Sequence, residues 1–383
     1  MSLNWPTAVA RARRIVAGCA DPKPAALTAH GAHLISGAAR FEDAHTIVVN
    51  DRKLVGEHLL VATGARPPRP PIAGLDYMST HVQALEWEQP PQSLAVVGGG
   101  IIGMEFAYLF ARTGARVVVL ELLDHVLDGV DDEMRDLIVR HAQQLGVTLA
   151  TGVRVQAVVP DGAQYRLTVD QPMPPTAPDR FDQVLLATGQ TPAVDGLQLE
   201  QAGVSYTRAG VATDATLRTN VPHIWAAGDV RAGARKLTQV ASYEGKLAVH
   251  NALTGNVSAI DERVVPYLIG LTPPMASVGL SEEEARDAGY AVGMHRQTYR
   301  DVCPAGNIVG EPEGLLKIVF DLAAGTLLGA HAFGANAPEL IQQLSFAILG
   351  KLTLRQAGAA LYTFPGLCEV VWYALRPHPG DPA

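Results

Sequence analysis

Residues 93–121 read SLAVVGGGIIGMEFAYLFARTGARVVVLE, and this stretch decides the fold. Its first apolar run, residues 94–97, predicts a short buried strand. The glycine-rich turn that follows leads into a helical pattern that continues to Phe110 and that Gly114 ends. Residues 116–120 then predict a second strand. A strand, a helix and a second strand in this order predict a parallel α/β sheet.

The turn carries a GxGxxG pattern formed by Gly98, Gly100 and Gly103, and Glu121 follows the second strand. Glycines here permit a tight turn, let the backbone approach a pyrophosphate, and allow the helix to pack closely on the strand. The pyrophosphate would rest on the positive N-terminus of the helix. Glu121 would accept hydrogen bonds from both ribose hydroxyls and repel a 2′-phosphate, which predicts NADH rather than NADPH. The alternative is a glycine-rich turn without a ligand.

Two segments of the chain resemble each other, and this internal echo indicates how the rest of the chain is organised. Residues 59–71 read LLVATGARPPRPP, and residues 185–196 read LLATGQTPAVDG. Each is a strand-like run that ends in Ala-Thr-Gly, which predicts two related nucleotide-binding modules, although chance similarity is the alternative. Residues 224–230, IWAAGDV, place Asp229 after a third such run. Asp229 is either an exposed turn residue or a handle for a cofactor hydroxyl.

The predicted fold class is α/β, with two Rossmann-like nucleotide-binding modules, the first incomplete, and a C-terminal α+β domain. In that last domain, strand-like runs at 315–320 and 326–333 precede helices near 336–350 and 366–376. The predicted divisions are 1–78 and 191–262 for the first module, 79–190 for the NAD(H)-binding domain, and 263–383 for the C-terminal domain.

Composition excludes several classes of protein. The 383 residues are 48% hydrophobic and 18% charged, with a net charge of −8, which fits sizeable cores and argues against nucleic-acid binding. No apolar run reaches the roughly 18 residues of a membrane span. Cys19, Cys303 and Cys368 lie far apart without a CxxC pair, a cytoplasmic pattern that excludes a local dithiol. His30 and His33 indicate a surface loop rather than a metal site.

The first module lacks a glycine fingerprint within this chain. In the second module Gly98 precedes Thr188 by 90 positions, and the same distance counted back from Thr63 falls before residue 1. Residues 1–62 contain no GxGxxG. We therefore expect this sequence to hold only the rear part of its first nucleotide-binding module.

The order ATG, GxGxxG with Glu121, ATG, AAGD and a C-terminal α+β domain resembles the flavin-dependent pyridine nucleotide-disulfide oxidoreductases. Dihydrolipoamide dehydrogenase, mercuric reductase and the soluble transhydrogenase are members. The resemblance covers nearly the whole chain. It implies FAD and NAD(H) as cofactors, a homodimer joined through residues 263–383, and hydride transfer between NADH and flavin.

The resemblance also implies roles for particular residues. Asp229 matches the aspartate that binds the ribityl chain of the flavin, and Thr63 and Gly64 match a segment lying against it. The helix that starts near Thr238 matches one whose N-terminus faces the pyrimidine edge of the flavin. Ile101 stands where the family has a residue that gates access of the nicotinamide.

Two carboxylates are candidate catalytic residues by the same resemblance. Glu105 matches a glutamate that pairs with a lysine near the flavin. In residues 363–369, TFPGLCE, Glu369 matches a glutamate that orients an acid–base histidine, but Phe364 replaces that histidine. Gly189, in the second ATG segment, is a further candidate cofactor contact. Cys368 is either a substitute thiol or a small buried filler.

Two functions remain open from the sequence. The first is an NADH-dependent flavoprotein oxidoreductase without a redox disulfide, because the CxxxxC segment of the family is absent. The second is a truncated, dimeric NADH-binding remnant without flavin or catalysis. A lost pyrophosphate cradle removes several charge-assisted hydrogen bonds of about 1.5–3 kcal/mol each, which predicts FAD binding weaker by roughly three decades or absent.

Overall fold

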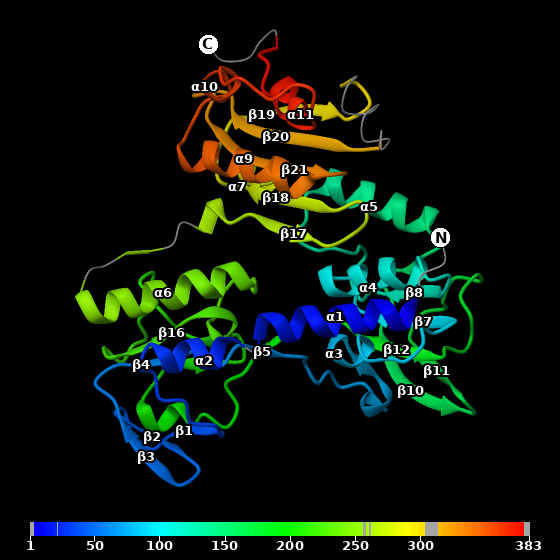
Figure 1. The fold of residues 1–383 in the computed structure, drawn as a ribbon. Helices are drawn as coiled ribbons and strands as arrows, with labels where there is room; N and C mark the ends of the chain where they lie inside the picture. Colours follow the sequence, from blue (N-terminus) through cyan, green and yellow to red (C-terminus); the bar gives the residue numbers. More distant parts are fainter. Residues whose placement is uncertain (1–3, 21, 256–257, 260–261, 303–312, 379–383) are drawn as a thin grey trace. The chain divides into compact units, whose positions relative to one another are not determined.

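The computed structural model describes residues 4–20, 22–255, 258–259, 262–302 and 313–378 (Figure 1). Cys303, one of the three cysteines, lies outside these residues. The chain divides into two compact units. The first unit comprises residues 1–70, 82–90 and 188–260, and the second comprises residues 71–81, 91–187 and 261–383.

The second unit contains a five-stranded parallel sheet. The strand order is β6 (Ser79–Thr80), β12 (Gln183–Leu186), β7 (Ser93–Val97), β8 (Arg116–Leu120) and β9 (Thr148–Ala150). Every residue of β7 is buried, as parallel strands covered on both faces require. The predicted strands at 94–97 and 116–120 are therefore confirmed.

Two helices accompany this sheet, α4 (Ile101–Ala111) and α5 (Asp132–Gln144). The Asp131 side chain caps α5 by accepting the N–H of Met134 at 3.4 Å. The same unit carries η1 (Leu75–Tyr77) and a hairpin of β10 (Val155–Asp161) and β11 (Gln164–Val169). The short helix α3 (His81–Ala84) follows β6.

The C-terminal part of the second unit is a five-stranded antiparallel sheet with helices. The strand order is β17 (Tyr267–Ile269), β18 (Met275–Gly279), β21 (Leu327–Phe333), β20 (Leu315–Asp321) and β19 (Val292–Thr298). The helical elements are η4 (Glu262–Val264), α7 (Glu282–Asp287), α9 (Ala337–Leu349), α10 (Leu354–Gly358) and α11 (Cys368–Ala374). Figure 1 shows α9 lying along the sheet, with which it shares one apolar core. The predicted α+β architecture is confirmed.

A buried lysine joins the two sheets of the second unit. The Lys317 side chain, on β20, is 3% exposed and lies 2.8 Å from the Asp131 carboxylate that caps α5. Glu282 lies 3.1 Å and Glu133 3.7 Å from the same ammonium group. Burial alone would raise the pKa of Asp131, but the nearby charges of His331 and Lys317 and its hydrogen bonds outweigh burial and hold this pKa below its usual range. This cluster ties the parallel sheet to the antiparallel one.

The first unit is built from shorter pieces. It begins with α1 (Trp5–Ala20) and α2 (Pro22–Ala29), followed by the antiparallel sheet β1 (Ala39–Phe41), β2 (Thr46–Val49) and β3 (Arg52–Val55). Later elements are β14 (Tyr206–Thr207), β15 (Gly210–Val211), η2 (Leu199–Ala202), η3 (Gly228–Val230) and α6 (Thr238–Thr254). His30 and His33 lie in the exposed segment after α2, as predicted.

The parallel pairing in this unit joins β4 (Leu59–Val61) to β16 (Ile224–Ala226), the runs before the first ATG and before AAGD. The two ATG segments also meet. Their exits form the antiparallel pair β5 (Ala65–Arg66) and β13 (Thr191–Pro192). The exits of the two similar segments are thus in direct contact in the structure.

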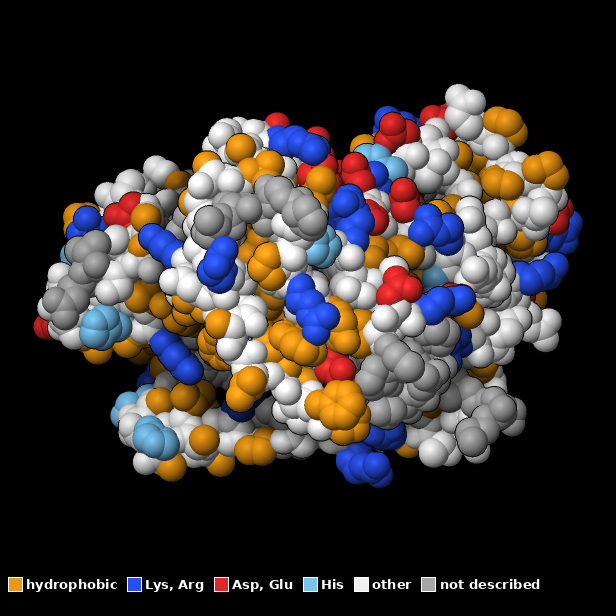
Figure 2. All heavy atoms as spheres, turned by 90° about the horizontal axis from the view of Figure 1, so that it is seen from above, with side chains coloured by type: hydrophobic (Ala, Val, Ile, Leu, Met, Phe, Trp, Pro, Cys, Tyr) orange, Lys and Arg blue, Asp and Glu red, His pale blue; other side chains and the backbone are white. Residues whose placement is uncertain are grey.

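The surface mixes charge types. On the face drawn in Figure 2, basic and acidic side chains are interspersed with apolar ones. Among the residues described, no helix is both long and apolar enough to cross a membrane.

Candidate nucleotide-binding sites

The glycine-rich turn leaves β7 in a conformation that favours glycine. Gly98 has φ +109°, in the left-handed region where L side chains are strained. A Cβ added to Gly103 would lie 2.0 Å from the carbonyl oxygen of Gly98. Any larger residue at Gly103 would push α4 away from the turn. Both positions therefore require glycine for backbone reasons, whether or not a ligand is bound.

The N-terminus of α4 opens directly from this turn. Gly100 is the N-cap residue, and no side chain caps the helix there. The uncapped first turn presents N–H groups and the positive end of the helix dipole, which suit a phosphate group. Ile101, the first helical residue and the predicted gate, is 37% exposed.

Glu121 reaches back from the end of β8 to the same turn. Its Oε2 accepts the N–H of Gly99 at 2.6 Å, and its Oε1 accepts the N–H of Leu123 at 2.9 Å. Each carboxylate oxygen has a second lone pair free to accept another hydrogen bond. The carboxylate is thus fixed in place by the backbone and still able to receive ribose hydroxyls.

Gly99 is a functional position that the sequence reasoning passed over. A Cβ there would lie 2.6 Å from Cγ1 of Val126 and 3.2 Å from Cβ of Glu121. Only glycine lets Glu121 lie this close to the turn. The signal was the run of three consecutive glycines, of which the GxGxxG pattern uses two.

The ATG segments lock together in the first unit. The Thr63 hydroxyl donates to the carbonyl oxygen of Ala193 at 2.8 Å, and the N–H of Ala193 donates to the carbonyl of Gly64 at 2.8 Å. Gly64 has φ +72° and Gly189 has φ +97°. Arg66 forms an ion pair with Asp195 beyond the paired exits. Thr63, Gly64 and Gly189 therefore shape one connected turn region.

The AAGD turn is held by a buried carboxylate. Glu244, on α6, is fully buried, and its Oε2 accepts the N–H of Gly228 at 2.7 Å. Its Oε1 accepts from the Arg231 guanidinium at 2.6 Å. The sequence reasoning missed both residues. A glutamate on the apolar face of a helix, 15 positions after Asp229, was the available signal.

Asp229 is not the exposed turn residue of the first alternative, because it is partly buried in η3, between the buried residues Gly228 and Val230. Burial raises the pKa of Asp229, Lys236 lowers it and Glu244 raises it. Within the described residues its carboxylate has no hydrogen-bond or ion-pair partner. A partly buried acceptor without a donor suits a ligand that carries hydroxyl groups.

The helix that follows, α6, starts at Thr238 as predicted. Its N-cap residue, Leu237, is extended, and no side chain caps the helix. The open N-terminus of α6 and the Asp229 carboxylate lie in one unit, where the first could meet the pyrimidine edge of a flavin and the second could accept hydrogen bonds from ribityl hydroxyls. These residues fit the flavin end of FAD, whereas residues 1–62 contain no GxGxxG for its pyrophosphate.

The two candidate catalytic carboxylates are both engaged locally. Glu105 accepts the N–H of Gly270 at 2.6 Å, and burial raises its pKa while this hydrogen bond lowers it. Glu369 is 3% exposed and accepts the N–H of Gly366 at 3.1 Å. Phe364 is 73% exposed in the same turn.

Cys368 is only partly buried, so a tightly buried filler is not what the structure shows. Its thiol donates to the carbonyl of Thr363 at 3.0 Å. The thiol and Glu369 thus both brace the segment at residues 363–369.

Comparison with protein families places two models on the chain. Residues 19–245 match the pyridine nucleotide-disulphide oxidoreductase family. Residues 265–375 match the dimerisation domain of the same family. Together these matches span both units described above.

Individual proteins agree with the family models. Dihydrolipoyl dehydrogenase from Haloferax volcanii is 32% identical over 360 residues, which cover 91% of this chain and 75% of that protein. Mercuric reductase from Staphylococcus aureus is 35% identical over 329 residues, or 85% of this chain and 59% of that protein. The structure of the HOCl-induced flavoprotein disulfide reductase RclA from Escherichia coli aligns with a TM-score of 0.89 at 26% identity, covering 98% of this chain and 86% of that one.

Proposed function

Because the chain belongs to the pyridine nucleotide-disulphide oxidoreductase family, we propose that it transfers hydride between NADH and flavin without a redox disulfide. The carrying observation is the Glu121 carboxylate, fixed on the glycine turn by the Gly99 N–H at 2.6 Å. This arrangement provides a helix N-terminus for the pyrophosphate and an acceptor for the ribose. It supports nucleotide binding by this chain, and not only the assignment of its fold.

The preference for NADH over NADPH rests on charge. A 2′-phosphate beside Glu121 would meet a carboxylate that the backbone prevents from turning away. The next residues, Leu122 and Leu123, are apolar and exposed, and they supply no cation for a phosphate. We therefore expect NADH to bind at least about tenfold more tightly than NADPH.

FAD would be held by the first unit. Asp229 would accept hydrogen bonds from ribityl hydroxyls, and the open N-terminus of α6 at Thr238 would favour negative charge nearby. When bound there, FAD would supply the two-electron carrier between NADH and an acceptor. Glu244 and Arg231 would keep the Asp229 turn in shape while the carboxylate itself remains available.

The absence of a redox disulfide is part of the proposal. The chain has three cysteines, widely separated in sequence, and Phe364 stands where disulfide-reducing members carry a histidine. Phenylalanine cannot transfer a proton to a thiol. These residues favour an acceptor other than a disulfide substrate.

Self-association is supported by the matched dimerisation domain and by exposed apolar side chains on it. Phe346 is 67% and Phe364 73% exposed. Large apolar side chains exposed on a matched dimerisation domain would be covered in a homodimer, which we therefore expect. Sedimentation velocity should give a mass near twice that of the chain; a monomer at all concentrations would contradict it.

The visible spectrum tests the function directly. The purified chain, titrated with excess FAD at equilibrium, should bind the flavin weakly, as expected without a pyrophosphate cradle, and NADH should bleach the absorbance of the bound flavin in the absence of oxygen. A chain that binds NADH but never acquires flavin absorbance would overturn the proposal. That result would favour the other candidate, an NADH-binding dimer without catalysis.

A further inference from the structure

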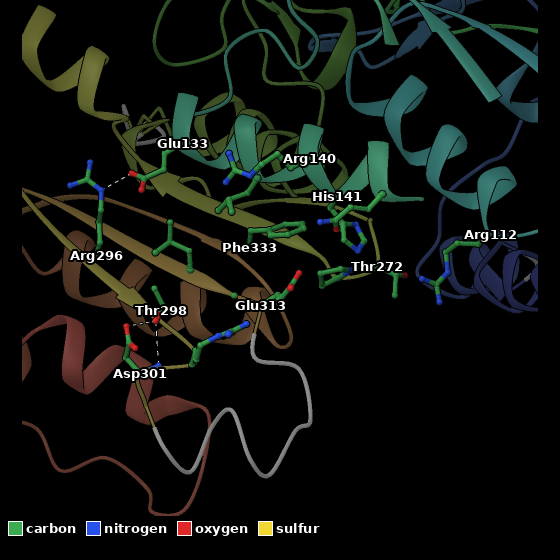
Figure 3. A pocket seen from close by; sticks show the side chains of 16 residues that line it. Arg112, Glu133, Arg140, His141, Thr272, Arg296, Thr298, Asp301, Glu313 and Phe333 are labelled. Carbon is green, nitrogen blue, oxygen red and sulfur yellow. Dashed lines mark hydrogen bonds and ion pairs between the residues drawn. The ribbon is translucent and has the colours of Figure 1, made fainter. Parts of the chain in front are cut away.

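A large cavity in the second unit lies outside both nucleotide-binding regions. Its volume is about 790 Å³, and residues from α5, β19 and β21 and the end of α4 line it (Figure 3). We propose that this cavity binds a small amphipathic organic anion, an aryl or alkyl body that carries a carboxylate-type head group. The inference does not depend on the proposed function.

The cavity has an apolar wall. Phe333 is 4% exposed on β21, and Leu137 and Leu315 also line the space. The ring of His141 packs edge-on against Phe333, with centroids 5.9 Å apart. Figure 3 shows Arg140, His141 and Phe333 next to one another. Such a wall provides the apolar contacts that small-ligand sites usually have.

The polar part of the lining carries a small excess of positive charge, because it contains four arginines and three carboxylates, Glu133, Asp301 and Glu313. Of the four arginines, Arg296 is paired with Glu133 at 2.7 Å. Arg112, just after α4, and Arg140, near the end of α5, form no ion pair with any carboxylate that the structure describes. The Asp301 carboxylate accepts from the hydroxyl of Thr298. Two free guanidinium groups beside an apolar wall select an anion with an apolar body.

The excess of positive charge belongs to this cavity and is not found throughout the second unit. In a second cavity of about 640 Å³ carboxylates outnumber cations: its lining includes the acidic residues of the segment 128–132, Glu282, Glu283, Glu284 and Asp287, against Arg135, Arg286 and Lys317. An anion would be repelled there, so binding of an organic anion in this unit points to the arginine-lined cavity.

Fluorescence of 8-anilino-1-naphthalenesulfonate provides the assay, with octanoate, octanol and inorganic phosphate as competitors on the full chain. Octanoate should displace the probe with a Kd of about 1 mM or below. Octanol and phosphate should each be at least about tenfold weaker, since each lacks one half of the required chemistry.

The variants Arg112→Gln and Arg140→Gln should each weaken octanoate binding about tenfold, and the double variant more. Arg355→Gln, an exposed arginine on α10, is the matched control and should leave binding unchanged. Both test positions lie at the far end of α4 and α5 from the glycine turn, so retained NADH binding shows that the variants are folded. Equal octanoate binding by the folded double variant and the parent, or equal displacement by octanol, would overturn the proposal.

Discussion

The two candidate nucleotide-binding regions hold their glycine turns in the same way but use different numbers of carboxylates. In each, a glycine N–H in the turn after a parallel strand donates to a glutamate: Gly99 to Glu121 at 2.6 Å and Gly228 to Glu244 at 2.7 Å. Glu121 is also the residue expected to meet the ligand. In the AAGD turn the tasks are divided, because Glu244 holds the backbone and Asp229 keeps its carboxylate free.

Because of this difference, substitutions can separate the stability of the turn from ligand binding in the AAGD region but not in the glycine-turn region. Loss of Glu121 should disturb the turn and the ligand contact together, since one side chain performs both. Loss of Glu244 should disturb the turn, and loss of Asp229 should affect only the ligand contact. Substitutions at the three positions therefore test the comparison directly.

Glu244→Ala should have the largest effect on stability. It leaves the Arg231 guanidinium, 11% exposed, without its carboxylate, and it removes the acceptor of the Gly228 N–H. Breaking a buried pair in this way costs about 3–5 kcal/mol of unfolding free energy. Urea unfolding measures it, with Glu57→Ala, an exposed glutamate of the same unit, as control. A loss no greater than that of the control would show that Glu244 does not hold the turn.

Glu121→Gln should lower stability and NADH affinity together. The amide can accept from only one of the two backbone donors, Gly99 or Leu123, which costs about 1–2 kcal/mol. NADH binding, followed by fluorescence titration, should weaken about tenfold. Asp136→Asn, on the exposed face of α5, removes the same charge and should change neither. If affinity fell while stability stayed at the parent value, the double role of Glu121 would be wrong.

The sequence predicted the glycine turn and Glu121 because both obey local rules. A strand, three glycines and a helix are contiguous, so their geometry follows from spacing. The sequence did not reveal Glu244 or Arg231, because their contact with the AAGD turn depends on how α6 packs back on β16. It also did not reveal that Asp229 is partly buried, because the burial of a turn residue is set by elements distant in sequence. Local sequence patterns predicted the helices and strands. Which residues support the candidate site depends on packing between segments that are distant in sequence.

The two ATG segments offer a smaller test within the same comparison. The Thr63 hydroxyl donates to the Ala193 carbonyl at 2.8 Å, whereas Thr188, its counterpart in the echo, is exposed and engages no described residue through its hydroxyl. Thr63→Val should cost about 1 kcal/mol of unfolding free energy, and Thr188→Val about half of that or less. Urea unfolding without ligand measures both. If both variants lost the same unfolding free energy, the Thr63 hydroxyl would contribute no more to stability than the Thr188 hydroxyl.

Asp229→Asn should have the smallest effect on stability and the opposite sign. Burial raises the pKa of Asp229, so ionisation of this carboxyl is less favourable in the folded chain than in the unfolded chain. Its contribution to stability is present below the usual pKa range of aspartate and is lost as pH rises through the raised folded pKa. The variant lacks this titration. Its unfolding free energy at pH 7 should equal or exceed that of the parent by under about 1 kcal/mol, and the difference should vanish or reverse at pH 4. FAD binding, measured beside it, should weaken at least about tenfold, because the amide is a poorer acceptor for hydroxyls than a carboxylate. A variant that lost stability at pH 7 as Glu244→Ala does would show that Asp229 also supports the turn, and the division of tasks between the two carboxylates would fail.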